Sequence, residues 1–194
     1  YVLSREDLLW KKGLNLLFVF TMYFGGGMVP YYMVLKNLGM LNNFIVFIFP
    51  NIISVYNMIL VKNYIEGMPK EIFESSKIDG ANDLVIFFKI VFPLSKPIIM
   101  TIALFVAVMH WNSWFDAYLY TNSQSLKTMQ SILVEILNQY QTSSANQAAN
   151  QAGQQLTPDS IRMAATMIAT IPIIMVYPFI QKYFVKGVTV GALK

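Results

Sequence analysis

The sequence predicts an all-α protein, a polytopic bundle of transmembrane helices. Of its 194 residues, 56% are hydrophobic and only 12% are charged, whereas roughly a quarter are charged in an ordinary soluble domain. The apolar residues come in long runs rather than at the period of an amphipathic helix or strand. A run of about 20 such residues crosses a bilayer, and four runs qualify. We interpret residues 1–194 as a single membrane domain.

The four predicted spans cover residues 13–35, 44–61, 97–120 and 161–184. Breaks are expected in two of them: Gly25-Gly26-Gly27 and Pro30 interrupt the first, and Pro50 falls within the second. Glycine clusters and prolines loosen a transmembrane helix and free backbone groups that neighbouring helices or water must satisfy. Such a break marks either a transport path or a plain packing kink, and both readings stay open.

The distribution of basic residues predicts the orientation. If the region before the first span, the segment between the second and third spans and the C-terminus are cytoplasmic, eleven of the 14 Lys and Arg residues lie inside; Lys36, Lys127 and Arg162 lie outside. This agrees with the positive-inside rule. We therefore expect a multi-pass protein of the cytoplasmic (inner) membrane, surrounded by the lipid bilayer, with its C-terminus in the cytoplasm. A nucleic-acid partner is not expected, because no basic helix interleaved with aromatics is present.

Three further features of the sequence limit what kind of protein this chain can be. The chain begins at Tyr1 in what resembles the end of a helix, so we expect a C-terminal portion of a longer protein. Without cysteine, no disulfide or thiolate metal site is expected. An external loop, residues 121–159, contains a Gln/Asn/Ala-rich tract that cannot form a core and is expected to be mobile or partly helical. Residues 129–137 within it are expected to form a short helix, and the loop is a candidate contact for an external partner.

The segment of residues 68–93 interrupts the apolar pattern with two short amphipathic helices. Pro69 suits the start of the first helix, and Glu71 suits the positive end of its dipole. Gly80 ends this helix, because glycine readily adopts the left-handed conformation. Asn82 or Asp83 caps the second helix, residues 84–91, which Pro93 and Pro97 stop. The segment is either a hairpin packed on its own bundle or a docking surface for a partner.

The spacing within this segment carries a resemblance to a known family. Glu74-Ser75-Ser76, three residues, Gly80, nine residues and Ile90-Val91-Phe92-Pro93 resemble the EAA motif of binding-protein-dependent ABC importer permeases, which reads E-A-A, x3, G, x9, I-x-L-P. The departures are serines for both alanines and phenylalanine for leucine. Asp79-Gly80-Ala81 extends the match. The phrase VMHWNSWF (residues 108–115) and the tail from Tyr177 to Gly191 resemble the maltose-type carbohydrate-uptake branch, and within it the lipoprotein-linked polysaccharide permeases.

The resemblance implies the type I ABC importer permease fold, with about two upstream spans beyond these four. It implies that the EAA loop forms coupling helices that seat in a cleft of a cytoplasmic ATPase subunit. Glu74 would pair with a basic group of the ATPase or cap the loop, and Gly80 would permit the turn between the helices. The phenylalanines Phe87 and Phe88 would supply buried contact area. Residues 186–194 resemble a tail that reaches toward the ATPase, although Gly187 and Gly191 could simply end the helix. The implied coupling residues are Glu74, Ser75, Ser76, Asp79, Gly80, Ala81, Phe87, Phe88, Ile90 and Pro93.

Polar and aromatic residues within the spans are candidates for a substrate pathway, because aromatic rings stack on sugars and amides or carboxylates bond hydroxyls. Asn112 and Asp116 are four apart and share a face of the predicted helix. An aromatic belt at the membrane interface or helix-packing hydrogen bonds are the alternatives. The only histidine, His110, is expected to be a hydrogen-bonded interface residue. The pathway candidates are Asn51, Ser54, Asn57, Trp111, Asn112, Trp114, Asp116 and Tyr118.

No G-x-x-x-x-G-K-[ST] phosphate loop occurs in the chain, and no catalytic or metal-binding motif is found. We therefore expect a non-enzymatic permease subunit with no cofactor of its own, and ATP and Mg on a partner ATPase. The resemblance implies alternating-access import of a sugar, an oligosaccharide or polysaccharide fragment. The implied partners are a second, non-identical permease, two ATP-binding subunits and an extracytoplasmic solute-binding protein. A permease for a non-sugar solute and a membrane scaffold are the alternatives; an ion-coupled transporter would show internal repeats.

Overall fold

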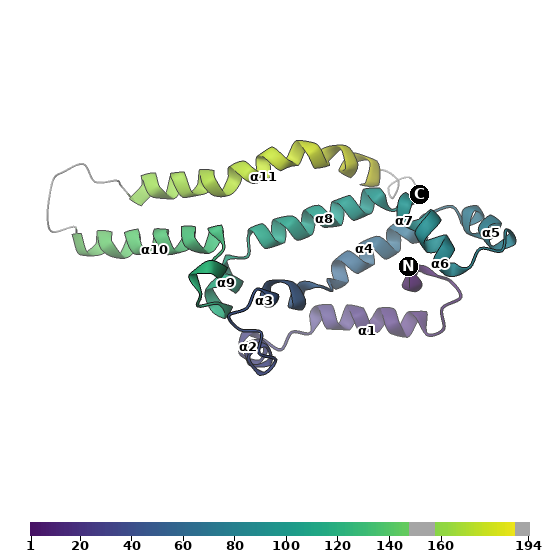
Figure 1. Cartoon of the computed structure of the whole chain (residues 1–194), viewed down its shortest axis with the longest axis horizontal. Coiled ribbons are helices and arrows are strands. Elements are labelled where there is room, and N and C mark those ends of the chain that lie inside the picture. The colour runs from purple at the N-terminus through teal and green to yellow at the C-terminus, as the bar shows by residue number, and fades with distance from the viewer. Residues whose placement is uncertain (148–157, 189–194) are drawn as a thin grey trace. The chain divides into compact units, whose positions relative to one another are not determined.

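The computed structural model describes residues 1–147 and 158–188, and every regular element within them is helical (Figure 1). The chain divides into two compact units. Unit 1 comprises residues 1–27, residues 52–105 and the described part of residues 179–194. Unit 2 comprises residues 28–51 and the described part of residues 106–178.

Unit 1 contains the predicted docking segment. Its elements are a 3-10 helix (Val2–Ser4), α1 (Lys11–Tyr23), α4 (Val55–Glu66), α5 (Lys70–Ile78), α6 (Asp83–Ile86), a π-helical segment (Phe87–Val91), α7 (Phe92–Leu94) and the first part of α8 (Lys96–Trp111).

Unit 2 holds the remaining helices. They are α2 (Met28–Asn37), α3 (Ile45–Ile48) with a 3-10 turn (Phe49–Asn51), the end of α8, α9 (Trp114–Tyr120), a 3-10 turn (Gln124–Leu126), α10 (Met129–Gln147) and most of α11 (Pro158–Val188). Helix α10 extends beyond the short helix expected over residues 129–137. Residues 148–157 of the Gln/Asn/Ala-rich tract lie outside the described residues.

The break expected in the first span lies at the glycine cluster: α1 ends at Tyr23 and α2 begins at Met28. Gly27 has a φ of +87°, a conformation that suits glycine. Pro30 does not contribute to the break, contrary to expectation. It sits in the first turn of α2, where a missing N–H has no intrahelical partner to lose.

Two other interruptions differ from those expected. Pro50 lies inside the 3-10 turn, and the break follows it at residues 52–54. The run expected over residues 97–120 is not continuous, because α8 ends at Trp111 and α9 begins at Trp114. Pro93 also does not stop the second docking helix. The helical run continues to Leu94, then bends by 71° into α8.

Among the described residues, one stretch, Asp159–Pro178 in α11, is long and apolar enough to cross a membrane as a single helix. Up to four spans result if each of three bent helix pairs counts as one broken span. Only 6% of the Asp159–Pro178 stretch is buried. The positions of the four spans stay predictions.

Each unit has its own apolar core. In unit 2, the core residues are Leu35, Val46, Phe47, Ala117 and Tyr120. In unit 1, Ile86 and Val91 are each 1% exposed and pack with Ile65 of α4. Positions five apart lie on different faces of an α-helix, which repeats every 3.6 residues. The π-helical segment, with i→i+5 bonding, brings Ile86 and Val91 onto one buried face.

Asn42 organises a turn in unit 2. Its backbone has a φ of +54°, and its N–H donates to the Tyr120 carbonyl at 2.8 Å. Its side-chain Oδ1 accepts from the backbone N–H groups of Asn122 (3.0 Å) and Ser123 (2.9 Å). One side chain therefore holds the chain after α9 against the loop before α3.

We expect Asn42→Ala to destabilise unit 2 by about 1–3 kcal/mol, because two N–H groups lose their acceptor and alanine tolerates positive φ less well than asparagine. Thermal unfolding of the purified subunit in detergent measures the change. Asn42→Asp, which keeps the acceptor, is the matched control and should stay close to the wild type. Equal loss in both variants would show that the oxygen is unimportant.

Candidate functional site

Helix α5 is amphipathic, as its sequence predicts. Ile72 and Phe73 are half-buried and Ser76 is buried, so these three share the inward face. Phe73 packs against the unit 1 core. The Ser76 hydroxyl donates to the Ile72 carbonyl at 2.6 Å. A small residue, serine, thus occupies this buried position where the EAA pattern has its second alanine.

The turn after α5 has the geometry of a Schellman motif. The Ala81 N–H donates to the Ser76 carbonyl and the Gly80 N–H donates to the Lys77 carbonyl, each at 3.0 Å. This pair of bonds requires a left-handed residue just past the helix, and Gly80 has a φ of +78°. The prediction that Gly80 ends the helix in this conformation is confirmed. Asp79 is the last residue before the reversal and is exposed.

Helix α6 begins with a side-chain cap. The Asn82 Oδ1 accepts from the Val85 N–H at 2.9 Å, which decides between the two capping candidates. Asp83 is therefore left at the first helical position with its carboxylate available to other partners. Its side chain forms an ion pair with Arg5, at the end of the helix where negative charge is favourable.

Exposed apolar side chains mark the outer surface of this helical pair. Ile78 is 86% exposed, Leu84 69% and Phe88 63%; we call these three the exposed apolar residues. Apolar side chains exposed in this way are available for a partner to cover. The sequence reasoning missed Ile78, although an isoleucine outside the amphipathic face and directly before the turn is the available signal.

The other predicted coupling residues take different positions. Phe87 is half-buried and contacts the rings of Tyr1 (5.4 Å between centroids), Phe88 and Phe92. It thus supports the helix from inside, whereas Phe88 faces outward. The remaining residues divide by burial: Glu74, Ser75 and Pro93 are exposed, and Ala81 and Ile90 are half-buried.

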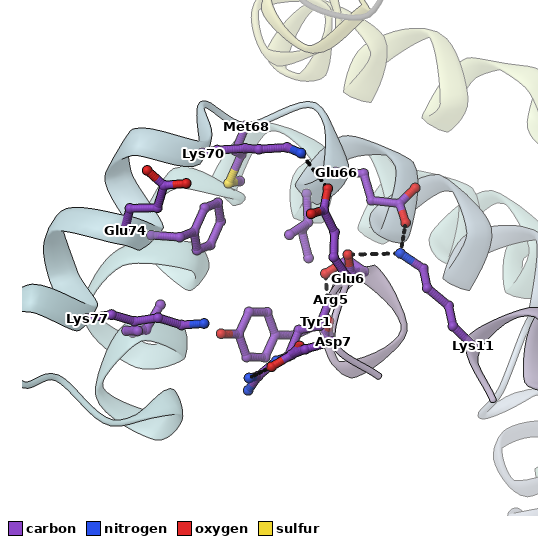
Figure 2. A pocket seen from close by; sticks show the side chains of 14 residues that line it. Tyr1, Arg5, Glu6, Asp7, Lys11, Glu66, Met68, Lys70, Glu74 and Lys77 are labelled. Carbon is purple, nitrogen blue, oxygen red and sulfur yellow. Dashed lines mark hydrogen bonds and ion pairs between the residues drawn. The ribbon is translucent and has the colours of Figure 1, made fainter. Parts of the chain in front are cut away.

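The first residues of the chain lie beside α5 and α6 and enclose a cavity of about 420 Å³ (Figure 2). Its lining carries both signs of charge. Lys70 Nζ lies 2.5 Å from Glu6 Oε1, and Lys11 Nζ lies 2.8 Å from Glu66 Oε1. Arg5 bonds Asp7 with two nitrogens, at 2.5 and 2.8 Å. The first two pairs join residues 1–11 to α5 and α4, and the third lies within that segment.

The carboxylates of residues 1–11 have lowered pKa values. The hydrogen bond from Arg5 lowers the pKa of Asp7 from 3.8 to about 2. The hydrogen bond and charge of Lys70 lower the pKa of Glu6. Because folding lowers the pKa of Asp7, its contribution to stability is present above its ordinary pKa and is lost as the pH falls toward about 2.

We expect Asp7 to titrate near pH 2 in the intact subunit and to return toward its ordinary pKa of 3.8 in Arg5→Ala. Carboxyl carbon NMR of a subunit labelled at aspartate measures both values, with Asp7→Asn to assign the signal. Acidification from pH 7 to pH 5 should leave the Arg5–Asp7 pair intact. An Asp7 titration that is the same with and without Arg5 would contradict the ion pair.

Several pathway candidates form local bonds. The Asn51 amide donates to the Phe47 carbonyl at 3.4 Å. Ser54 is the N-cap of α4, and its hydroxyl accepts from the Asn57 N–H at 3.3 Å. Ser54 thus lies just before α4, and Asn57 in the first turn of α4 is half-buried.

The aromatic candidates are divided between two helices. Trp111 at the end of α8 donates its indole N–H to the Ala169 carbonyl of α11 at 3.1 Å, which is a helix-packing bond. Trp114 of α9 packs edge-on against Phe115, with centroids 5.5 Å apart. Tyr118 is 74% exposed.

The break between α8 and α9 corrects the expectation that Asn112 and Asp116 share one helical face. Asn112 lies in the break, and its amide donates to the Val108 carbonyl at 2.8 Å. Asp116 is half-buried in α9. Within residues 1–147 and 158–188, no group of three or more His, Asp or Glu side chains is placed to hold a metal ion.

The helical architecture and the capped turn at Gly80 are features expected of a helical membrane permease. The chain belongs to the family of binding-protein-dependent transport system inner membrane components, whose model matches residues 8–190. This confirms the resemblance that the EAA spacing indicated. Several of the similar curated proteins are named for the transport of sugars.

Two relatives come from Bacillus subtilis (strain 168). The chain is 44% identical to the polygalacturonan/rhamnogalacturonan transport system permease protein YtcP over 194 residues, covering all of this chain and 68% of that protein. It is 42% identical to Protein LplC, again over the full chain and 65% of the relative. The chain therefore spans about two thirds of the length of these relatives.

A solved structure has a similar fold. A bacterial ABC transporter involved in the import of the acidic polysaccharide alginate contains a chain that aligns with a TM-score of 0.72 at 28% identity. The alignment covers 94% of this chain and 65% of that one. The ABC importer permease fold is thus shown for this chain.

Proposed function

We propose that this chain is the transmembrane permease subunit of an ATP-driven importer that moves a sugar across the cytoplasmic membrane by alternating access. The observation that carries the proposal is the turn at Gly80. It joins two short helices through a Schellman motif and presents the exposed apolar residues, at the spacing of the EAA motif. The family match over residues 8–190 supports the same reading.

The docking loop determines how the permease is powered. The chain contains no phosphate-binding loop, so ATP and Mg are assigned to two separate ATP-binding subunits. Their closure would move α5 and α6, and the 71° bend into α8 would carry this movement into the predicted third span. In this scheme the loop and the C-terminus face the cytoplasm. Residues 189–194 of the C-terminal tail lie outside the described residues, and the tail's contact with the ATPase stays a prediction.

Fragments of acidic polysaccharides are the first substrate class to test. One relative is named for polygalacturonan and rhamnogalacturonan transport, and the similar solved transporter is described as importing alginate. A second, non-identical permease would complete the pathway, and an extracytoplasmic solute-binding protein would deliver the sugar. A scaffold role is not supported by any described feature, and a non-sugar solute is less consistent with the relatives.

Purification of the full-length subunit from its native membrane tests the assembly. We expect it to retain a second permease and an ATPase that contains a phosphate-binding loop, and to bind a loaded solute-binding lipoprotein. Proteoliposomes of this complex should take up labelled oligogalacturonide only when ATP is enclosed in their lumen, on the side of the ATPase. Uptake of neutral oligosaccharides alone would change the substrate class. Recovery of neither ATPase nor binding protein would overturn the proposed function.

A further inference from the structure

Residues 1–11, the N-terminal segment, contact both coupling helices at once. Glu6 pairs with Lys70 at the start of α5, and Arg5 pairs with Asp83 at the start of α6. The ring of Tyr1 packs on Phe87, which follows α6. These contacts involve the two helices on either side of the Gly80 turn. A segment distant in sequence therefore links the two halves of the docking loop.

The N-terminal segment is itself attached to the membrane-directed helices. Lys11, the first residue of α1, pairs with Glu66 at the end of α4 at 2.8 Å and donates to the Ser4 carbonyl at 3.2 Å. The Ser4 hydroxyl in turn donates to the Tyr1 carbonyl at 2.6 Å. The contacts thus run without interruption from α1 and α4, through residues 1–7, to α5 and α6.

Of the two ionic contacts to the docking loop, Arg5–Asp83 is more shielded than Glu6–Lys70, although the Asp83 side chain is 50% exposed. The Arg5 side chain is 24% exposed, whereas the Glu6 and Lys70 side chains are 75% and 69% exposed. Exposed pairs contribute little because water screens them. A guanidinium that holds two carboxylates in a fixed geometry is stronger than such a pair. Of the ionic contacts to the docking loop, the Arg5–Asp83 contact is therefore the one expected to matter most.

The cavity in Figure 2 lies between the N-terminal segment and α5, and Arg5 belongs to its lining. The space between the N-terminal segment and α5 is open over about 420 Å³ rather than filled by side chains. Close packing alone cannot fix the distance across an open space. Charged side chains reach across it, and Lys77 and Tyr1 point into it from opposite walls. The N-terminal segment is therefore held to α5 by the exposed Glu6–Lys70 pair, whereas Arg5 reaches α6 through Asp83.

We propose that Arg5 is a positioning residue for energy coupling: it holds α6 through Asp83 so that movement of the docking loop is transmitted to α1 and α4. This inference rests on the proposed function, since it concerns how ATPase movement reaches the spans. It adds a rigid connection that does not pass through the bend between α7 and α8. Without Arg5 the ATPase should still bind, but less of the movement of the docking loop should reach α1 and α4.

The test uses the complete transporter in proteoliposomes, with loaded binding protein, and measures sugar molecules imported per ATP hydrolysed. In Arg5→Ala the complex should assemble normally, while this ratio falls about threefold, in line with the loss of one partly shielded ion pair. Arg5→Lys keeps the charge and should recover part of the ratio. Glu6→Gln, which removes an exposed pair, and Lys12→Ala, which removes an exposed cation of α1, are controls that should resemble the wild type.

A double-mutant cycle separates the specific contact from general weakening. Asp83→Asn alone should lower the ratio, and adding Arg5→Ala to it should cause no further loss, because both remove the same contact. Additive losses, or a ratio unchanged in Arg5→Ala, would overturn the inference while leaving the proposed function intact. Absence of ATP-dependent uptake in the wild type would instead overturn the proposed function.

A second measurement applies if Arg5→Ala fails to assemble with the ATPase. Hydrogen exchange of the isolated full-length subunit reports how firmly α5 and α6 are held. Amides of residues 70–86 should exchange about threefold faster or more in Arg5→Ala and at the wild-type rate in Lys12→Ala. Equal exchange in both variants would overturn the inference.

Discussion

Replacing Gly80 with valine is expected to abolish sugar uptake while the subunit still inserts into the membrane. A β-branched residue strongly disfavours the left-handed conformation that Gly80 adopts at a φ of +78°, and the backbone cost is about 1–2 kcal/mol. An added Cβ would meet no atom within 4 Å, so the effect comes from the backbone alone. The turn would relax to a negative φ, the two Schellman bonds would break, and α5 and α6 would no longer hold their mutual orientation.

Uptake in proteoliposomes and stimulation of ATP hydrolysis by the loaded binding protein measure the loss. Gly67→Ala is the matched control, because Gly67 has a φ of −80° and its added Cβ would lie 3.5 Å from backbone oxygens, an ordinary contact. Gly80→Asn should fall between the two, since asparagine tolerates the left-handed region. Normal uptake by Gly80→Val would contradict the role of the turn in coupling.

Ile86→Ala is expected to destabilise unit 1 by about 2–5 kcal/mol, the range for truncating a buried isoleucine. Ile86 is 1% exposed and packs with Ile65 and Val91. It is therefore the contact that fixes α6 to α4 from inside. Because the cavity left behind lies under the docking loop, coupling should fail at temperatures where the rest of the subunit remains folded.

Leu84→Ala gives a sharp comparison in the same short helix. Leu84 is 69% exposed, so its truncation should change the free energy of unfolding by less than about 0.5 kcal/mol. Thermal unfolding in detergent distinguishes the two variants, and Ile86→Val should lie between them. If Leu84→Ala and Ile86→Ala destabilised the subunit equally, the assignment of an inner and an outer face to α6 would be wrong.

Local features of the fold were predictable because short-range chemistry determines them. The glycine cluster does separate α1 from α2, Gly80 does end α5, and Asn82 caps α6. The effect of single prolines was not predictable from their presence. Pro30 is tolerated in the first turn of α2, whereas Pro93 lies near the end of a helical run that continues to Leu94. Only its position in the surrounding helix decides whether a proline breaks it.

The docking segment was located from its spacing, but the division of its residues into inner and outer faces was not. The sequence pattern does not distinguish Phe87 from Phe88, yet Phe87 packs on Tyr1 and Phe88 is exposed. The ion pairs of Arg5 and Glu6 join residues far apart in the chain, and no local pattern reveals such contacts. The shared face of Asn112 and Asp116 assumed a continuous helix, and the break at Asn112 removes it.

The π-helical segment makes the length of the docking loop as important as its composition. Ile86 and Val91 share a buried face only because one turn between them holds an extra residue. Deleting any residue from 87 to 91 would allow an ordinary α-helical turn and rotate everything after it, so that a different side of the following helix would face the core. The number of residues between Gly80 and Ile90, nine, therefore sets the rotation of α8 relative to the docking loop. Even a deletion that leaves every motif residue in place would misalign the loop with α8.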